Sequence, residues 1–409
     1  MVGGDGRAHA LAHVLGRTAT EVLVSGGAAG VPNATPAPAE DLDADLFVIS
    51  PEAPLVDGIA DRLRAQGKLV FGPGADGARL EGSKAWMKDL LAKAGVPTAK
   101  HGTFTEVEPA LEYLRSSPAP YVIKTSGLAG GKGVLVTESL IEAEDDVKAK
   151  LGGAAFGDAG RTVVIEEGMT GPELSMLAVC DGTAAVALAP AQDFKRALDG
   201  DHGPNTGGMG SYSPVPAAGP QLVDEVLERF VAPTLHALRA EGIDYRGTLY
   251  AGLMLTPDGM KLLEYNVRLG DPEAQVVLPR LTSDLVELLA GAAAGALPAA
   301  HPTFDDGAAV CVVCASPGYP EAPRTGATID GLDAARDLDG VLVFHAGVGL
   351  DADGRLVTAG GRVLDVVGLG PTLAHARQRA YEGVHRIDFA GMQYRSDIAA
   401  AAAKEERTS

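Results

Sequence analysis

The sequence predicts a mixed fold in which an α/β unit is followed by α+β parts, and three observations support this prediction. Strand-like and helix-like runs alternate through the first 80 residues, which is typical of a parallel sheet. Short strands separated by turns fill the middle of the chain, which is typical of mixed or antiparallel sheet. Strands and Gly-rich turns return near the carboxyl end. We therefore expect three parts, residues 1–80, 81–300 and 301–409.

Length and charge narrow the class of protein. The chain has 409 residues, 46% of them hydrophobic, which suffices for two or three domains with real cores. Its 34 Lys and Arg against 54 Asp and Glu give a net charge of -20, which disfavours a nucleic-acid partner. No run approaches the roughly 18 apolar residues of a membrane helix. We expect a soluble cytoplasmic protein with no membrane partner.

The three cysteines, Cys180, Cys311 and Cys314, are too few for a disulfide framework and fit a reducing compartment. Cys311 and Cys314 form a CxxC, but they lie in the apolar run 308–315, which reads as a buried strand with the two residues on opposite faces. A structural zinc site would need four ligands. We interpret the cysteines as structural.

The first part contains alternating elements. Apolar spacing predicts a helix around Leu11–Leu15 and another over Val56–Gln66, and a loop rich in Gly, Ala and Pro reaches Asp41. The predicted strands are Val22–Val24, Leu46–Ile49 and Leu69–Phe71.

The middle part begins with a helix from Ser83 to Lys93, closed by Gly95 and Pro97. A long helix is expected over Gln221–Glu241, and another over Ser283–Gly295 with Ser283 as its cap. The turn Thr256–Gly259 predicts a hairpin. The predicted strands are 121–124, 134–136, 162–166, 174–179, 184–189, 249–255 and 260–266.

A glycine-rich loop, Gly127–Gly133, joins two of these strands. Its backbone can approach a ligand closely, and Lys132 can present a charge to phosphate. It is not a Walker loop, because Ser126 stands where the first glycine should be and a strand follows. An ordinary flexible hairpin is the alternative interpretation of this segment alone.

Strand alternation places Glu264 and Asn266 on one face, which presents two oxygen ligands of the kind that suit Mg²⁺. A solvated strand end would show the same pattern. The neighbouring Arg268 can grip a carboxylate or a phosphate in a forked geometry, and Gly270 permits close approach.

Two polar segments, Gln192–Arg196 and Gly203–Gly210, form a long loop region of the kind that is usually functional. If the first is extended, Asp193 and Lys195 share a face; a surface ion pair is the alternative. The run Val163–Met169 looks like a strand ending in a hinge whose backbone could pair with an adenine edge.

In order along the chain, several motifs resemble the phosphoribosylamine–glycine ligase (glycinamide ribonucleotide synthetase) family of the ATP-grasp superfamily. The resemblance spans nearly the whole chain, and a dozen ordered motifs are far more specific than one glycine loop. They include Leu80–Lys84, Val122–Lys124, the glycine-rich loop, Ile165–Glu167, Gln192–Arg196, Gly203–Gly210, Glu264–Glu273 and Thr358–Arg362.

The resemblance implies an ATP-grasp fold with a small, shortened N-terminal parallel α/β subdomain, a flap-bearing subdomain at about 101–171 and a C-terminal α+β subdomain. It places ATP phosphates near Lys84, Lys124, Gly130, Gly131, Lys132 and Gly133. It places adenine near Glu166, Glu167 and Met169, and ribose near Glu173. Mg²⁺ or Mn²⁺ would lie on Glu264 and Asn266.

The resemblance also implies glycine and phosphoribosylamine as substrates of a monomer or weak homodimer, with a glycyl phosphate intermediate. Arg268, Lys132 and Asp193 would be the catalytic residues. Glycine would contact Asp193, Arg268 and Gly270, and the acceptor would lie near Gly4, Gly6, Arg7 and Glu52. The other substrate-binding residues would be Lys195, Asn205 and Asp271.

This chain departs from the family pattern mostly on the acceptor side. Met1–Val2 leaves almost no first strand, the segment between Gly30 and Asp45 is short, and Phe194 stands where a histidine is expected. Two alternatives therefore stay open, a divergent ligase that uses another amine acceptor and a non-catalytic nucleotide-binding relative.

Overall fold

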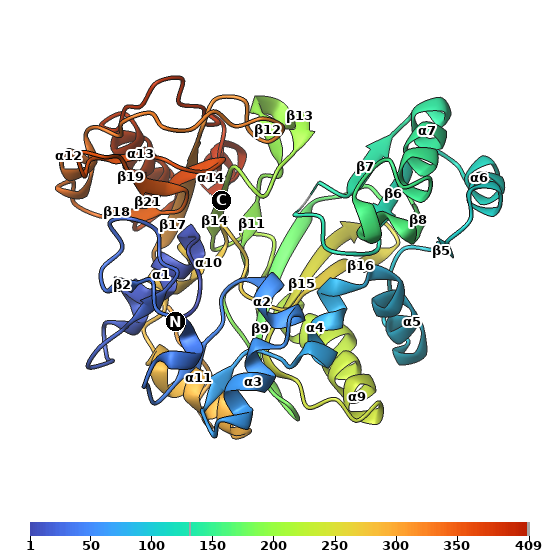
Figure 1. Cartoon of the computed structure of the whole chain (residues 1–409), viewed down its shortest axis with the longest axis horizontal. Coiled ribbons are helices and arrows are strands. Elements are labelled where there is room, and N and C mark those ends of the chain that lie inside the picture. The colour runs from blue at the N-terminus through green and yellow to red at the C-terminus, as the bar shows by residue number, and fades with distance from the viewer. Residues whose placement is uncertain (131, 407–409) are drawn as a thin grey trace.

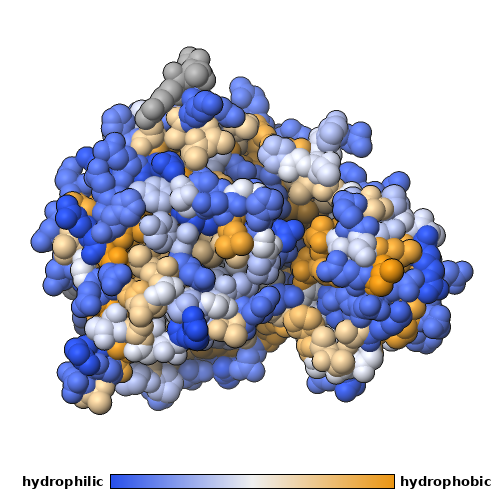
Figure 2. All heavy atoms as spheres, turned by 90° about the horizontal axis from the view of Figure 1, so that it is seen from above, coloured by the Kyte–Doolittle hydropathy of each residue, from blue (hydrophilic) through white to orange (hydrophobic). Residues whose placement is uncertain are grey.

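The structure is a computed structural model that describes residues 1–130 and 132–406. Figure 1 shows the N-terminal segment lying beside the C-terminal segment, with a smaller body that carries α6, α7 and β6–β8 on the opposite side. Figure 2 shows that smaller body as a lobe set off from the rest by a notch. Within the described ranges, no helix is long and apolar enough to cross a membrane.

The N-terminal part contains two parallel strand pairs joined through a single residue. Strand β1 (Val24–Ser25) pairs with β2 (Ala34–Thr35), and β3 (Phe47–Val48) pairs with β4 (Val70–Phe71). Val2 forms parallel bridges to both Ser25 and Ile49. The predicted parallel layer is confirmed, and one residue stands where the first strand would run. Its helices are α1 (Gly6–Leu15), α2 (Glu52–Val56), α3 (Ile59–Ala65) and α4 (Ala75–Gly82).

Two predictions for this part were wrong. The loop up to Asp41 contains strand β2 and a 3-10 turn, Ala39–Asp41. The helix predicted over Val56–Gln66 is α3 and begins three residues later, at Ile59, because Gly58 adopts a left-handed conformation, with φ 78°, between α2 and α3.

The smaller body is an antiparallel sheet in the order β5-β8-β6-β7, with two helices. It has its own hydrophobic core, which includes Leu111, Ile123 and Ile165. The glycine-rich loop connects β6 to β7 as predicted, so we call this body the flap unit. Its elements are β5 (His101–Phe104), α6 (Val107–Ser116), β6 (Tyr121–Thr125), β7 (Val134–Thr137), α7 (Leu140–Leu151) and β8 (Val163–Glu167).

The central sheet has the order β10-β9-β15-β16 and is antiparallel throughout. Thr256 pairs with Gly259 across the predicted turn. The register shifts at Gly252 and Leu253, so Leu263 is an extra residue in its strand. The strands are β9 (Glu173–Asp181), β10 (Ala185–Ala187), β15 (Arg246–Thr256) and β16 (Gly259–Asn266).

The helices of the middle part test the predicted caps. Helix α5 (Lys84–Ala94) begins after Ser83 and ends at left-handed Gly95, as predicted. The long helix is α8 (Pro220–Val226) and α9 (Ala232–Ala240) joined by a π turn, Leu227–Val231; Pro233, which lacks an N–H, is the second residue after that turn. Ser283 is not the cap of α11 (Leu285–Ala294), because Asp284 accepts from Val286 N and Glu287 N.

The C-terminal strands β17, β21 and β18 form an antiparallel sheet with β11 and β14 of the middle part, in the order β11-β14-β17-β21-β18, which confirms the α+β prediction. In β17, Cys311 and Cys314 are buried free thiols that face two different hydrophobic clusters. The elements are β11 (Gln192–Asp193), β14 (Gly210–Ser213), β17 (Ala308–Ala315), β18 (Val341–His345), β21 (Arg362–Gly370), α10 (Ala274–Val277), α12 (Leu332–Arg336), α13 (Leu373–Val384) and α14 (Ala400–Glu406), with hairpins β12 (Arg196–Leu198) to β13 (His202–Asn205) and β19 (Val348–Leu350) to β20 (Leu356–Thr358).

Candidate active site

Lysines and carboxylates meet where the flap unit contacts the central sheet, and we call this region the nucleotide side. Lys124 on β6 is 5% exposed and donates to Leu263 O of β16 at 3.3 Å. Its ammonium lies 3.0 Å from Glu166 Oε2. Burial alone would lower the pKa of Lys124, but Glu166 and Glu264 hold it above its ordinary value. Lys124 therefore stays charged where the two bodies meet.

Lys88 is a buried member of this cluster that sequence reasoning missed. It lies on α5 one turn after Lys84, is fully buried, and its ammonium is 3.0 Å from Glu166 Oε1 and 2.7 Å from Thr98 Oγ1. Burial lowers the pKa of Lys88 to about 8, against the attraction of Glu166. The i, i+4 spacing of Lys88 from Lys84, which places both on one face of a helix, was the sequence signal that could have identified it. Glu166 thus bridges two lysines with its side chain, so only its backbone could face an adenine.

The predicted metal ligands share one end of β16, just after the bulge at Leu263. Among the described residues, none donates a hydrogen bond to the Glu264 carboxylate. Although burial would raise its pKa, Lys84 and Lys124 hold the pKa of Glu264 below its ordinary value. Asn266 Oδ1 accepts from Arg268 Nη2 at 3.2 Å. A charged carboxylate and an amide oxygen fit a hard divalent cation.

The flap residues predicted at the phosphates lie in the loop between β6 and β7. Lys132 is exposed, and no residue in the described ranges pairs with its ammonium. A Cβ on Gly133 would lie 2.0 Å from Thr125 Oγ1, so the flap needs glycine there. Gly130 has φ 56°. The predicted site residue Gly131 lies outside the described residues.

The hinge after β8 holds the other residues predicted at adenine and ribose. Glu167 pairs with Lys261 of β16 at 2.8 Å, and its carboxylate accepts from Lys100 N. Met169 follows in the loop to β9. Glu173, predicted at the ribose, forms an ion pair with Lys195.

In the next cluster, carboxylates outnumber cations. This cluster is the first part of the region that we call the substrate side. Lys195 Nζ, paired with Glu173, lies 3.7 Å from Asp193 Oδ1, so the predicted sharing of a face is confirmed. Burial and the nearby Glu273 and Glu173 raise the pKa of Asp193 to about 7, against the attraction of Lys195. A cation such as an ammonium group would relieve this crowding. Asn205 ends β13 on the neighbouring hairpin.

Arg268 connects the two sides. Its guanidinium lies 3.0 Å from Glu81 Oε1 and 3.3 Å from Glu52 Oε2. These carboxylates raise the pKa of Arg268 further above its ordinary value, although burial opposes them. Glu81 lies 187 residues from Arg268, so no local pattern could have indicated this pair.

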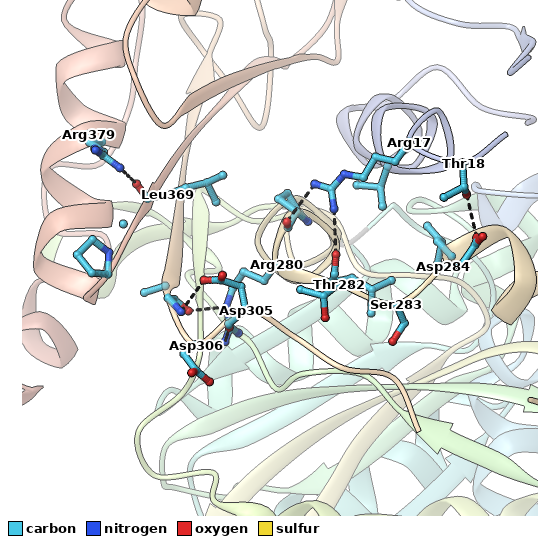
Figure 3. A pocket seen from close by; sticks show the side chains of 18 residues that line it. Arg17, Thr18, Arg280, Thr282, Ser283, Asp284, Asp305, Asp306, Leu369 and Arg379 are labelled. Atoms are coloured by element: carbon cyan, nitrogen blue, oxygen red, sulfur yellow. Dashed lines mark hydrogen bonds between the residues drawn. The ribbon is translucent and has the colours of Figure 1, made fainter. Parts of the chain in front are cut away.

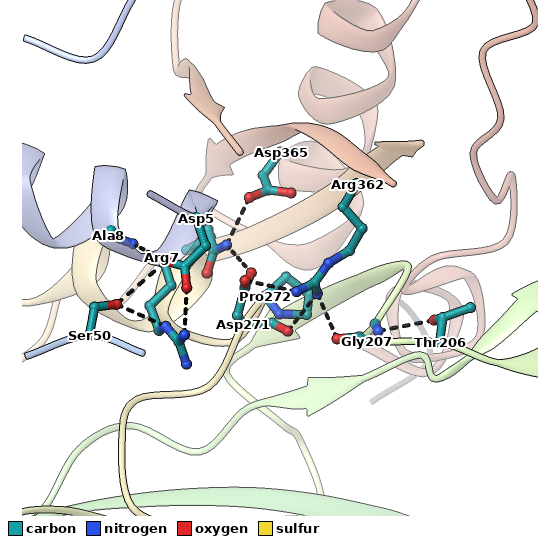
Figure 4. A network of polar contacts seen from close by, with 12 residues as sticks. Asp5, Arg7, Ala8, Ser50, Thr206, Gly207, Asp271, Pro272, Arg362 and Asp365 are labelled. Carbon is teal, nitrogen blue, oxygen red and sulfur yellow. Dashed lines mark hydrogen bonds and ion pairs between the residues drawn. The ribbon is translucent and has the colours of Figure 1, made fainter. Parts of the chain in front are cut away.

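Three of the residues predicted for the acceptor lie at the start of α1 and the fourth, Glu52, begins α2; Figure 4 shows the polar contacts of Arg7. Arg7 is 4% exposed and donates to Ser50 Oγ at 3.0 Å, Leu269 O at 2.7 Å and Asp5 Oδ2 at 2.5 Å. Glu52 Oε2 lies 3.9 Å from Arg7 Nη2. Arg7 and Glu52 thus come together with Arg268, as the predicted site requires.

The acceptor glycines have structural reasons to be glycine. A Cβ on Gly4 would lie 2.4 Å from Gly26 O, and one on Gly6 would lie 1.7 Å from Asp365 Oδ2. A Cβ on Gly270 would lie 2.3 Å from Glu273 Oε2.

Figure 4 also shows a polar network around the predicted residue Asp271, whose contacts sequence reasoning missed. Arg362 pairs with Asp271 Oδ2 at 2.8 Å and donates to Gly207 O at 2.6 Å, so it ties two predicted substrate loops together. Gln275 Nε2 donates to Asp271 Oδ1 and to Asp365 Oδ2. Burial and Asp271 raise the pKa of Asp365 to about 7.

A cavity of about 910 Å³ lies apart from these clusters, and Figure 3 shows its lining. Its arginines are already bonded to backbone oxygens, Arg17 to Leu281 O and Arg280 to Gly307 O. None of the predicted site residues lines it. We assign it no role in the chemistry.

Comparison with known proteins finds matches along nearly the whole chain. Three family models match in order: the N domain of phosphoribosylglycinamide synthetase over residues 1–81, its ATP-grasp (A) domain over 82–274 and its C domain over 309–401.

Individual relatives are similar over the same span. A phosphoribosylamine–glycine ligase of Xanthomonas campestris is 47% identical over 100% of this chain and 98% of its own length. That of Streptomyces coelicolor is 48% identical over 98% of this chain and 99% of its own. The crystal structure of the Thermotoga maritima ligase, 37% identical, covers 97% of this chain and 99% of that one with a TM-score of 0.85.

Proposed function

The chain belongs to the phosphoribosylamine–glycine ligase family, and from this premise we propose that it joins glycine to 5-phosphoribosylamine. The reaction consumes ATP and yields glycinamide ribonucleotide, ADP and phosphate, a step of purine biosynthesis. The observation that carries the proposal is the convergence of Lys124, Glu264 and Arg268 in a chain whose similarity to these ligases runs end to end.

The nucleotide side supports a role in binding ATP. Lys84, Lys124 and Lys132 present charge to its phosphates, and the flap glycines permit close approach of their backbone. Glu264 and Asn266 are the ligands that we propose for Mg²⁺ or Mn²⁺. When bound, such an ion neutralises phosphate charge during transfer. The side chains of Lys88 and Glu166 hold Lys124 in place, which leaves the backbone of Glu166 as the part that would face adenine.

The substrate side supports binding of glycine, an ammonium carboxylate. Asp193 would accept from its amine, with Lys195 and Asn205 nearby, and Arg268 with Gly270 would hold its carboxylate, with Asp271 next in the same loop. A glycine carboxylate oxygen attacks the γ-phosphorus of ATP, and the bond to the ADP oxygen breaks, which gives glycyl phosphate and ADP. The protein contributes position and charge neutralisation rather than covalent help.

The acceptor amine then attacks the glycyl carbonyl carbon, phosphate leaves, and the amine loses a proton. We place the phosphoribosyl group against Gly4, Gly6, Arg7 and Glu52, because Arg7 and Glu52 are held next to Arg268. Closure of the flap over the acyl phosphate would exclude water. We propose a monomer or weak homodimer as the working form.

A second candidate is a ligase that activates glycine but uses another amine. The observation in its favour is confined to the acceptor side, where Val2 alone bridges the two parallel strand pairs.

Two half-reactions separate the candidates. With ATP, Mg²⁺ and glycine, hydroxylamine should trap glycyl hydroxamate whichever amine is native. With phosphoribosylamine added, glycinamide ribonucleotide should form and ADP release should rise. Trapping without that product would favour the second candidate, and no glycine-dependent phosphoryl transfer would refute both.

A further inference from the structure

A segment near the carboxyl end, Arg395–Ile398, lies against the hairpin β12–β13. Figure 1 shows this hairpin beside α14, far along the chain from it. Ser396 N donates to Asp199 Oδ1 at 2.8 Å, and Asp397 Oδ2 accepts from Gly200 N at 2.8 Å. The segment therefore bonds to the turn of the hairpin, and we call it the clasp.

The clasp is itself fixed to helix α13. Tyr381 on that helix donates to Arg395 O at 2.7 Å and accepts from Ile398 N at 3.2 Å. Arg377 donates to Ser396 O at 2.6 Å and to Ile398 O at 2.9 Å. The clasp thus connects a helix of the C-terminal part to a hairpin about 200 residues earlier in the chain.

Arg395 is the centre of the clasp and is only 1% exposed. Its Nε and Nη2 donate to the two oxygens of Asp397, at 2.7 Å and 2.6 Å. Its Nη1 donates to Asp201 Oδ1 at 2.7 Å and to Arg196 O at 3.1 Å. The planar guanidinium reaches two carboxylates and a backbone oxygen at once, which a lysine cannot do.

The face of the same guanidinium covers Phe194, with 4.9 Å from Arg395 Cζ to the ring centroid. Phe194 lies between Asp193 and Lys195, and its backbone is bonded twice to one neighbouring segment. Phe194 N donates to Gly210 O at 2.9 Å, and Phe194 O accepts from Met209 N at 2.8 Å. With its ring held by Arg395 and its backbone held by the ladder, Phe194 fixes the direction of the two side chains beside it.

We propose that Arg395 is a positioning residue that sets Asp193 and Lys195 for glycine. The inference rests on the proposed function and adds a residue that touches neither substrate nor nucleotide. Arg395 acts through Phe194 and through the hairpin that carries Asn205, so its loss should loosen glycine binding and leave ATP binding intact.

The test compares Arg395→Met and Arg395→Lys with a matched control, Arg379→Met. Arg379 lies on the α13 to which the clasp is fixed, but it bonds Leu369 O and Asp339, away from the hairpin. We expect Arg395→Met to raise KM for glycine about tenfold with KM for ATP within about twofold of wild type. The KM for glycine of Arg395→Lys should lie between those of wild type and Arg395→Met, and the KM values of the control should match wild type.

Hydrogen exchange provides a readout that does not depend on turnover. Amides of residues 196–205 should exchange about tenfold faster in Arg395→Met, while those of the flap unit keep their rates. Parallel rises in both KM values, or an unchanged KM for glycine with a loosened hairpin, would overturn the positioning role. So would a lysine variant equal to wild type.

The two proposals fail differently. If wild-type protein gives no glycine-dependent ADP release, the proposed function fails. If wild type is active and Arg395→Met behaves as Arg379→Met does, the positioning role fails alone.

Discussion

The two sides of the candidate site differ in the charge that they crowd together. The nucleotide side gathers Lys84, Lys88 and Lys124 around Glu166 and Glu264, and burial lowers the pKa of Lys88 to about 8. The substrate side gathers carboxylates, and burial raises the pKa of Asp193 to about 7. Each side holds an excess of charge opposite to the ligand that we propose for it. The net charge of the chain, -20, gave no hint of this division.

The difference in charge between the two sides indicates how each side favours its ligand. Like charges held together in a poorly solvated region raise the free energy of the empty protein, and a ligand of opposite charge relieves that cost. ATP would relieve it on the lysine side, and the ammonium of glycine would relieve it at Asp193. A single substitution on either side should therefore change the balance of charge on that side and test this explanation.

The largest expected effect is at Glu264. Glu264→Ala should lower turnover about a thousandfold, because the site loses its one charged metal ligand. Thermal unfolding should change little, since the carboxylate is only half-buried. Steady-state ADP release at saturating ATP and Mg²⁺ measures the loss, with the exposed pair member Glu241→Ala as control. Near-normal turnover would refute the metal assignment.

Substitution of a buried residue on the nucleotide side should lower the stability of the folded protein. Lys88→Met removes a fully buried cation and leaves Glu166 with Lys124 alone, so we expect a loss of roughly 2–3 kcal/mol in unfolding free energy. Denaturant unfolding checks the value, with exposed Lys93→Met as the matched control. A variant as stable as wild type would show that Lys124 alone satisfies Glu166.

The substrate side should respond to pH in the opposite direction to an ordinary ion-paired carboxylate. Burial raises the pKa of Asp365 from 3.8 to about 7, so its stabilising contribution is complete below pH 4 and is lost as pH rises through 7. Asp365→Asn should therefore gain roughly 2–5 °C in Tm at pH 8 and lose that advantage at pH 4.

The exposed Asp353→Asn serves as control for that experiment. An Asp365→Asn variant that is less stable than wild type at pH 8 would contradict the expected protonation.

The smallest effect concerns the flap. Trypsin should cut after exposed Lys132 in the free protein, and ATP with Mg²⁺ should slow this cleavage severalfold, because the ligand orders the loop. Cleavage after Arg355, in the turn between β19 and β20, should keep its rate. Equal protection at both positions, or at neither, would count against flap closure.

Local signals predicted the parts of the fold that local chemistry determines. Ser83 and Gly95 bound α5 because capping depends on residues within one turn, and Thr256–Gly259 forms the hairpin turn for the same reason. The predicted cap of α11 was wrong by one residue. Serine and aspartate side chains can both accept from the first N–H groups of a helix, and in the structure Asp284 is the residue that does so.

Contacts between residues far apart in the chain could not be predicted from the sequence. Glu81 meets Arg268 across 187 residues and Arg395 meets Asp201 across 194, and no periodicity encodes either pair. The resemblance to a ligase family named the residues near the ligands and the motif that ends at Arg362, whereas the buried Lys88 and Asp365 were recognised only once the chain was folded.

Strand β17 has a practical consequence for measuring how the molecule opens. Cys311 and Cys314 are the same chemical group, buried in the same strand, and each points into a different hydrophobic cluster. A thiol-specific reagent under native conditions therefore times the exposure of each cluster separately. Equal labelling rates would mean that the strand leaves both clusters in one event, and unequal rates would rank the clusters by the frequency of their opening.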